Sequence, residues 1–162
     1  YKEDLNDFVL TLEYKILSGK TNSGIQIRSA KDKSGHAVGY QADLDDGKTW
    51  LGRIYDEGGR GLILERGTLT TISPIGKRVS LPFRKKDEFN SVPKKNDWNT
   101  YKIIARGHRI EIYINDIHFS TLEDYQKGQV DLQGYIALQI HSGIGPAKVQ
   151  FKNIDLRIAT KS

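Results

Sequence analysis

Residues 101–114 read YKIIARGHRIEIYI, and this stretch decides the fold class. Apolar and polar side chains alternate on both sides of Arg106-Gly107-His108, which has the composition of a turn. Alternation with a period of two places successive side chains on opposite faces of a strand. The stretch therefore predicts two half-buried strands separated by a short turn.

The same pattern continues outward from this stretch in both directions. It recurs at 8–16, 25–28, 40–44, 117–120, 135–141 and 149–158. Asn115-Asp116 stands where a two-residue hairpin turn belongs, and 50–55 reads as a further short strand. A hairpin over 62–65 and 68–72 and one helical turn within 83–92 complete the prediction. About ten short strands with glycine-rich turns predict an all-β sandwich or barrel.

The composition limits the class of protein. The 162 residues have the length of one domain, so a single domain over 1–162 is expected. No apolar run approaches the roughly 20 residues of a membrane helix, so no membrane span is predicted. The absence of cysteine excludes disulfides and thiolate chemistry. The net charge of +5 is spread along the chain instead of forming a basic stripe with aromatic residues, so no nucleic-acid partner is expected.

Alternation also identifies the side chains that leave the core. In 135–141 the isoleucines and leucine at even positions form the predicted apolar face, and Tyr135, Gln139 and His141 share the other. Further strands are expected to add polar side chains to that open face: Gln26, Arg28, Gln41, Asp43, Arg53 and Tyr55. This mixture of planar polar groups and rings suits a sugar. Any solvent-facing sheet is also polar, so both interpretations stay open.

His141 is the leading candidate for a catalytic group. It ends a predicted strand beside Ser142-Gly143-Ile144-Gly145, and an ordinary histidine pKa near 6.5 suits a general base at neutral pH. A solvent-exposed strand-end histidine would produce the same pattern. The segment 57–61 is glycine-rich but lacks a following P-loop lysine, so it is interpreted as a bent loop that aims Glu57 or Arg60 at a site.

An ordered set of motifs resembles the 3-keto-disaccharide hydrolase domain family. The motifs are NSGI at 22–25 followed by Arg28, GYQAD at 39–43, GRIY at 52–55, WNTY at 98–101, LQIHSG at 138–143 and VQFKNI at 149–154. The resemblance implies a two-sheet antiparallel jelly-roll sandwich of the concanavalin A-like kind. It also implies a periplasmic or secreted protein that acts on glycans.

Two departures from the family pattern stand out. Many members carry Tyr-Glu-x-Gln where this chain has Tyr40-Gln41-Ala42-Asp43. Members also usually begin with an additional segment that contains Trp and Gly before the strand at Phe8. We therefore expect a fragment of a longer chain that lacks this N-terminal segment.

The activity that the resemblance implies is cleavage of a glycoside already oxidised at C3 by a separate or fused sugar dehydrogenase. The C3 ketone acidifies the C2 proton, so a base can form an enolate that expels the C1 substituent. His141 is the expected base, and Arg28 and Arg53 are expected to stabilise the oxyanion. The expected substrate-binding residues are Gln41, Asp43, Tyr55, Glu57, Arg60 and Gln139. No cofactor is required, although a divalent metal could replace an arginine in its role.

Two other classes of function compete with an enzyme. A non-catalytic carbohydrate-binding module of a larger secreted protein would present an open groove lined by exposed Trp or Tyr, whereas an enzyme would enclose His141 in a cleft. Trp50 and Trp98 are the only tryptophans, which favours the enzyme slightly. A structural or adhesive domain would have no sugar site.

Overall fold

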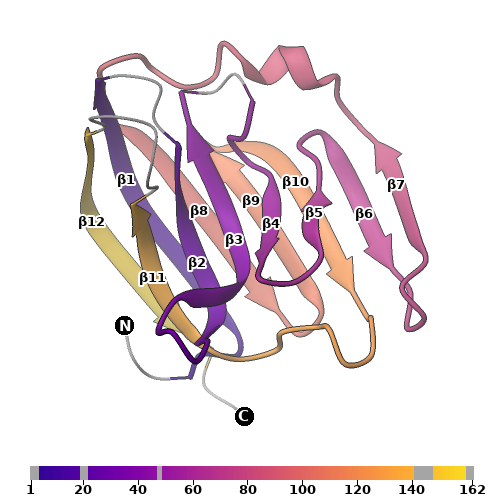
Figure 1. Ribbon diagram of the computed structural model, residues 1–162. Coiled ribbons are helices and arrows are strands. Elements are labelled where there is room, and N and C mark those ends of the chain that lie inside the picture. Colours follow the sequence, from indigo (N-terminus) through magenta and orange to yellow (C-terminus); the bar gives the residue numbers. More distant parts are fainter. Residues whose placement is uncertain (1–3, 19–21, 47–48, 141–147, 160–162) are drawn as a thin grey trace.

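Two β-sheets pack face to face in the computed structural model, which describes residues 4–18, 22–46, 49–140 and 148–159 (Figure 1). The seven-stranded sheet has the order β12-β1-β8-β9-β10-β6-β7, and the five-stranded sheet has the order β11-β2-β3-β4-β5. Neighbouring strands are antiparallel except β10 and β6, which are parallel. The predicted all-β jelly-roll sandwich is confirmed. No helix in the described part of the chain is long and apolar enough to cross a membrane.

The strands have the following bounds. They are β1 (Phe8–Ser18), β2 (Asn22–Lys31), β3 (Ala37–Asp45), β4 (Ile54–Glu57), β5 (Gly61–Leu64), β6 (Thr68–Ile72), β7 (Arg78–Pro82), β8 (Asn99–Arg106), β9 (Arg109–Ile114), β10 (Ile117–Asp124), β11 (Tyr135–Ile140) and β12 (Lys148–Ile158). A 3₁₀ helix, η1 (Lys86–Phe89), lies in the predicted segment 83–92.

The turn predictions hold at β9–β10 and fail after β5. Asn115 and Asp116 have φ values of 48° and 63°, as a type I′ hairpin turn requires. The predicted hairpin of 62–65 with 68–72 is wrong, because β5 and β6 belong to different sheets. Gly67 makes this crossing with φ of 77° and donates its N–H to the carbonyl of Phe119, 2.6 Å away. The predicted strand over 50–55 begins only at Ile54.

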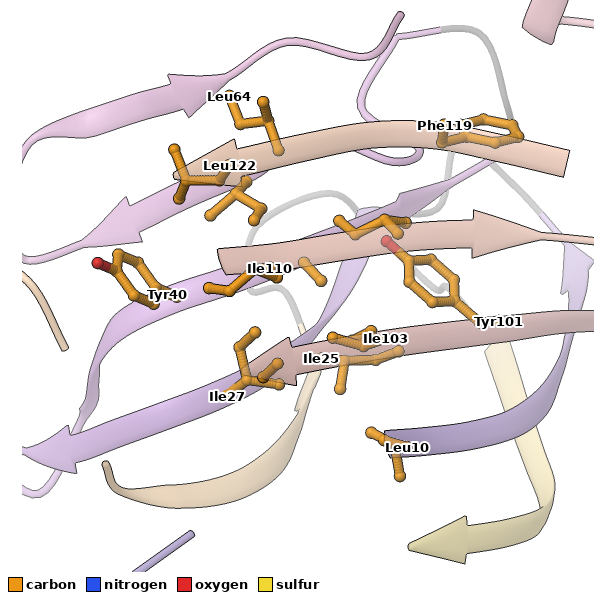
Figure 2. Close-up of a cluster of buried hydrophobic side chains, with 14 of the residues drawn as sticks. Leu10, Ile25, Ile27, Tyr40, Leu64, Tyr101, Ile103, Ile110, Phe119 and Leu122 are labelled. Atoms are coloured by element: carbon orange, nitrogen blue, oxygen red, sulfur yellow. The ribbon is translucent and has the colours of Figure 1, made fainter. Parts of the chain in front are cut away.

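The core lies between the sheets and contains the inward residues of both. Figure 2 shows Ile25, Ile27 and Tyr40 from the five-stranded sheet facing Ile103 and Ile110 from the seven-stranded sheet, all of them buried. Strands with one apolar face stabilise each other by this burial, at roughly 1.5–3 kcal/mol for a fully buried large side chain.

The predicted apolar face of β11 is only partly buried. Ile136 is 8% exposed, but Leu138 is 40% and Ile140 is 93% exposed. The two sheets do not close against each other along β11 and β12. An apolar hollow of about 420 Å³ lies there, lined by residues that include Leu10 and Leu156.

Arg28 does not lie on the open sheet face, which corrects its predicted position. The β2–β3 register shifts between Ile27 and Ala30, and Arg28 sits in this bulge with φ of 49°. A bulge adds a residue to one strand and re-aims its side chain. Arg28 is 2% exposed and donates to the carbonyls of Asn6 (2.6 and 2.8 Å) and Gly107 (2.6 Å). It therefore links β2 to the backbone at Asn6 and at Gly107, at one end of the sandwich.

Candidate functional site

The outer face of the five-stranded sheet carries a grid of polar side chains. Across β11, β2 and β3, Gln139 pairs with Gly24, and Gly24 pairs with Asp43. In the next row Gln26 pairs with Gln41, and Gln41 pairs with Tyr55 on β4. Because neighbouring strands are about 4.8 Å apart, Gln139 and Asp43 stand roughly 10 Å from each other, with only a glycine between them.

A hollow of about 320 Å³ opens on this grid. Its lining residues are Asn22, Gln41, Asp43, Trp50, Tyr55 and Glu57. Gln41, Asp43 and Tyr55 were predicted from alternation, and Glu57, the last residue of β4, from the glycine-rich segment that it begins. The hollow has the size of a small-ligand site.

Three buried oxygen atoms on this face have no hydrogen-bond partner among the described residues. They are Oδ1 of Asn22, Oδ2 of Asp43 and Oε1 of Gln139. Buried polar atoms without partners are uncommon, because each one costs about 1–3 kcal/mol. Oδ1 of Asn22 and Oε1 of Gln139 accept hydrogen bonds, and Oδ2 of Asp43 accepts or donates according to its protonation. A ligand rich in hydroxyl groups would therefore satisfy all three.

Trp50 is held at the hollow by contacts from two directions. The carboxylate of Asp45 accepts the backbone N–H groups of Thr49 (3.0 Å), Trp50 (2.6 Å) and Leu51 (3.0 Å). The guanidinium of Arg53 lies over the indole, 5.0 Å from its centroid. Tyr55 meets the same indole edge to face at 6.4 Å. A fixed indole beside polar groups is typical of a surface that takes the C–H face of a sugar.

Asp43 is the titratable group with the most unusual environment in the hollow. Burial raises its pKa to about 7, and the carboxylates of Glu57 and Asp45 add to this increase. The hydrogen bond from Gln41 and the charge of Arg53 oppose it. A carboxyl with a pKa near neutrality can hold or release a proton at physiological pH.

The structure does not bring the predicted arginines into the hollow. Arg53 binds Glu65 in a bidentate ion pair at 2.7 and 2.8 Å, so its charge is neutralised beside the hollow. Arg60 pairs with Asp56 at 2.6 Å and with Asp124 at 2.7 Å. Arg28 is engaged by backbone carbonyls.

Two other predictions concern His141 and a metal. His141 lies outside the described residues; Gln139, two positions earlier, shares the outer face with Asp43. Within the described ranges no group of three or more His, Cys, Asp or Glu side chains could hold a metal ion.

Asn22 and Trp50 are the lining residues that sequence reasoning missed. Asn22 lies two residues before Gly24 and four before Gln26. Alternation along β2 would therefore have placed all three on the outer face. Trp50 was assigned to a strand, and its place in the hollow depends on the loop that Asp45 organises. The cluster Asp43, Asp45 and Asp46 before a glycine was the available signal for such a loop.

Comparisons with known proteins agree with this architecture. A family model described as a 3-keto-α-glucoside-1,2-lyase-like domain matches residues 1–157. No curated protein matches the chain in sequence.

Solved structures with the same fold are distant in sequence. Carbohydrate-binding module CBM66 from Bacillus subtilis is 19% identical, with a TM-score of 0.61 over 96% of this chain and 77% of that chain. A protein from Parabacteroides distasonis, proposed to be a glycosyl hydrolase, is 17% identical, with a TM-score of 0.63 over 97% and 80%. Sheep galectin-11, solved with glycerol, is 7% identical, with a TM-score of 0.55 over 96% of both chains.

Proposed function

Because the chain belongs to the 3-keto-α-glucoside-1,2-lyase-like domain family, we propose that it binds a 3-keto-glycoside in the hollow of the five-stranded sheet and cleaves it by elimination. The observation that carries this proposal is the group of buried oxygens on Asn22, Asp43 and Gln139 that find no partner within the described part of the chain and lie near an indole. The hydroxyl and carbonyl oxygens of the sugar supply the missing partners, and the ring supplies apolar C–H bonds for Trp50.

The proposed reaction needs no redox step in this protein. A base removes the C2 proton, and the C–H electrons form the enolate of the C3 ketone. The enolate re-forms the ketone as a C1–C2 double bond develops and the C1 oxygen leaves with its electron pair. The leaving oxygen takes up a proton, and water can add across the new double bond afterwards.

His141 is the proposed base, on the strength of its position in the sequence. It follows Gln139 by two residues, and an imidazole is the side chain best suited to proton abstraction at neutral pH. A separate dehydrogenase would have to supply the C3 ketone, because a glycoside with a C3 hydroxyl has no acidic C2 proton. Export to the periplasm or beyond belongs to the same proposal and rests on the family resemblance.

The decisive experiment incubates the protein with an aryl 3-keto-glucoside, with and without a chelator, and follows release of the aglycone. We expect release by the wild type and loss of release in a folded His141→Ala variant. The matched control is His36→Ala, which replaces an exposed histidine in the β2–β3 turn. Full release by His141→Ala would remove this residue from the mechanism, and absence of release by the wild type would overturn the lyase proposal.

A non-catalytic binding module is the second candidate, and Trp50 is the observation that favours it. An indole fixed beside Tyr55 at a hollow is what a sugar-binding surface requires. This candidate predicts glycan binding that quenches tryptophan fluorescence, with neither a 3-keto-glucoside nor an ordinary glucoside cleaved.

A further inference from the structure

A one-way chain of hydrogen bonds crosses the outer face of the five-stranded sheet and ends on Asp43. The Ser29 hydroxyl donates to Oε1 of Gln26 at 2.7 Å, and Nε2 of Gln26 donates to Oε1 of Gln41 at 2.9 Å. Nε2 of Gln41 then donates to Oδ1 of Asp43 at 2.8 Å. Each amide is oriented by the donor before it, so Oδ1 of Asp43 is fixed as an acceptor.

The second oxygen of Asp43 has a different environment. Oδ2 is buried and has no hydrogen-bond partner among the described residues, and the whole residue is 2% exposed. An ionised carboxylate placed there would leave one charged oxygen without water or a donor, which is costly. A proton on Oδ2 removes that cost, and the acceptor role of Oδ1 leaves Oδ2 as the place for it.

The charged groups around Asp43 add to this preference for the neutral form. Glu57 on β4 and Asp45 on the same strand both raise the pKa of Asp43. Arg53, the neighbouring cation, lowers the pKa but is bound by both oxygens of Glu65. Burial is the largest cause, and the pKa reaches about 7.

We infer that Asp43 acts as a neutral carboxylic acid that donates the proton on Oδ2 in a hydrogen bond to an oxygen of the bound sugar. The inference rests on the proposed function, in which that oxygen is the C3 carbonyl oxygen of a 3-keto-glycoside. Negative charge develops there when the C2 proton leaves, and a preorganised donor in a dry site stabilises such charge. Asp43 keeps its proton throughout.

This role replaces the one predicted for the arginines. No cationic side chain is among the described residues that line the hollow, and Arg28, Arg53 and Arg60 are all engaged elsewhere. A neutral carboxyl donor also explains how a hollow lined by Asp43 and Glu57 can accept a ligand oxygen that becomes negative.

The first test measures protonation directly and needs no ligand. The ¹³C NMR signals of the aspartate carboxyl carbons are followed from pH 4 to pH 9, and the signal lost in Asp43→Asn is assigned to Asp43. We expect its midpoint near pH 7. Asp116→Asn, in the exposed β9–β10 turn, is the matched control and should leave the Asp43 signal and its midpoint unchanged. A midpoint for Asp43 near pH 4, the ordinary value for an aspartate, overturns the inference, whatever the protein cleaves.

The second test uses 3-keto-1,5-anhydroglucitol, a 3-keto sugar without a leaving group at C1. Wild-type affinity should fall above pH 7, by up to tenfold for each pH unit, as Asp43 loses its proton. Asp43→Asn should bind with similar affinity at pH 6 and lose the pH dependence, because its amide also donates. Asp43→Ala should bind at least tenfold more weakly at pH 6.

The two tests separate the inference from the function on which it rests. Equal pH dependence in the wild type and Asp43→Asn overturns the donor role. A protein that neither binds the probe nor releases the aglycone overturns the lyase proposal, whereas a titration midpoint near pH 7 would still establish the protonated Asp43.

Discussion

The side chain of Gln41 occupies the space that Gly24 leaves open on the neighbouring strand. A Cβ placed on Gly24 would lie 2.5 Å from Cγ and 2.6 Å from Cδ of Gln41. Gly24 also separates Gln139 from Asp43 in the same row of the sheet. The glycine therefore lets Gln41 lie flat over β2 and reach Asp43.

Gly24→Ala should accordingly damage the site more than the fold. The added methyl group must push Gln41 away from Asp43, at a cost of about 1–3 kcal/mol in the free energy of unfolding. Ligand affinity should fall at the same time. Urea unfolding and sugar titration check the two effects. In a Gln41→Ala background the same substitution should cost less, and an equal cost in both backgrounds would contradict this packing argument.

Asp43→Asn should change how stability depends on pH. Folded Asp43 keeps its proton up to about pH 7, whereas the unfolded chain releases it near pH 4. The folded state therefore binds more protons between these values, and wild-type stability falls as pH rises through this window. The asparagine variant lacks this loss, which is about 4 kcal/mol for a shift of this size.

Chemical denaturation at several pH values measures the difference between Asp43→Asn and the wild type. From pH 4 to pH 7 the free energy of unfolding of the variant should rise relative to that of the wild type. Above pH 7 the difference between the two proteins should stay constant. Asp131, whose pKa burial raises to about 6, is present in both proteins, so its contribution cancels. A difference that does not change with pH would mean that Asp43 is ionised throughout.

Arg28→Met should destabilise the protein strongly. The substitution removes the three hydrogen bonds that the buried guanidinium donates to the carbonyls of Asn6 and Gly107, and each hydrogen bond to a charged group is worth about 1.5–3 kcal/mol. Arg157→Met is the matched control, because Arg157 is 80% exposed and pairs with Asp155 on its own strand. It should change stability by less than about 0.5 kcal/mol. Similar midpoints of urea unfolding for the two variants would contradict the role given to Arg28.

Trp50→Ala should weaken sugar binding without unfolding the protein. Loss of the stacking surface is expected to cost about 1.4 kcal/mol, or about tenfold in the dissociation constant. Ligand-dependent quenching of fluorescence should also disappear. Trp98→Ala is the control, because Trp98 lies outside the hollow and contacts Lys152. Unchanged quenching in Trp50→Ala would place the ligand elsewhere.

The sequence predicted those parts of the site that depend only on strand alternation. Gln41, Asp43 and Tyr55 reach the hollow because successive side chains of a strand point to opposite faces. Their neighbours Tyr40, Ala42 and Ile54 point into the core. The motif Tyr-Glu-x-Gln of many family members adds a chemical detail. This chain has the amide of Gln41 where the motif has a carboxyl, and the carboxyl of Asp43 where the motif has an amide. The hydrogen bond between Gln41 and Asp43 shows that the two groups still share one face of the sheet.

The predictions that failed depend on contacts between distant residues. Arg28 turns inward at a bulge that period-two alternation does not reveal. Arg60 is held by Asp124, 64 residues later in the chain, and no local pattern indicates that partner. Leu138 and Ile140 have the alternation of core residues, but their strand lies at a sheet edge where burial also requires contact from the opposite sheet.

The position of β1 bears on how the protein is made. β1 lies between β8 and β12, so its first residues pair with residues near the other end of the described chain, as in Phe8 with Ile158. A ribosome releases β1 long before it releases β12, and the seven-stranded sheet cannot be completed until β12 has been synthesised. Pairing of β1 with β12 must close a very large loop, which places this protein among the slow folders. Until then β1 has an unpaired backbone edge and an exposed apolar face, Phe8 and Leu10 included, which a chaperone could cover.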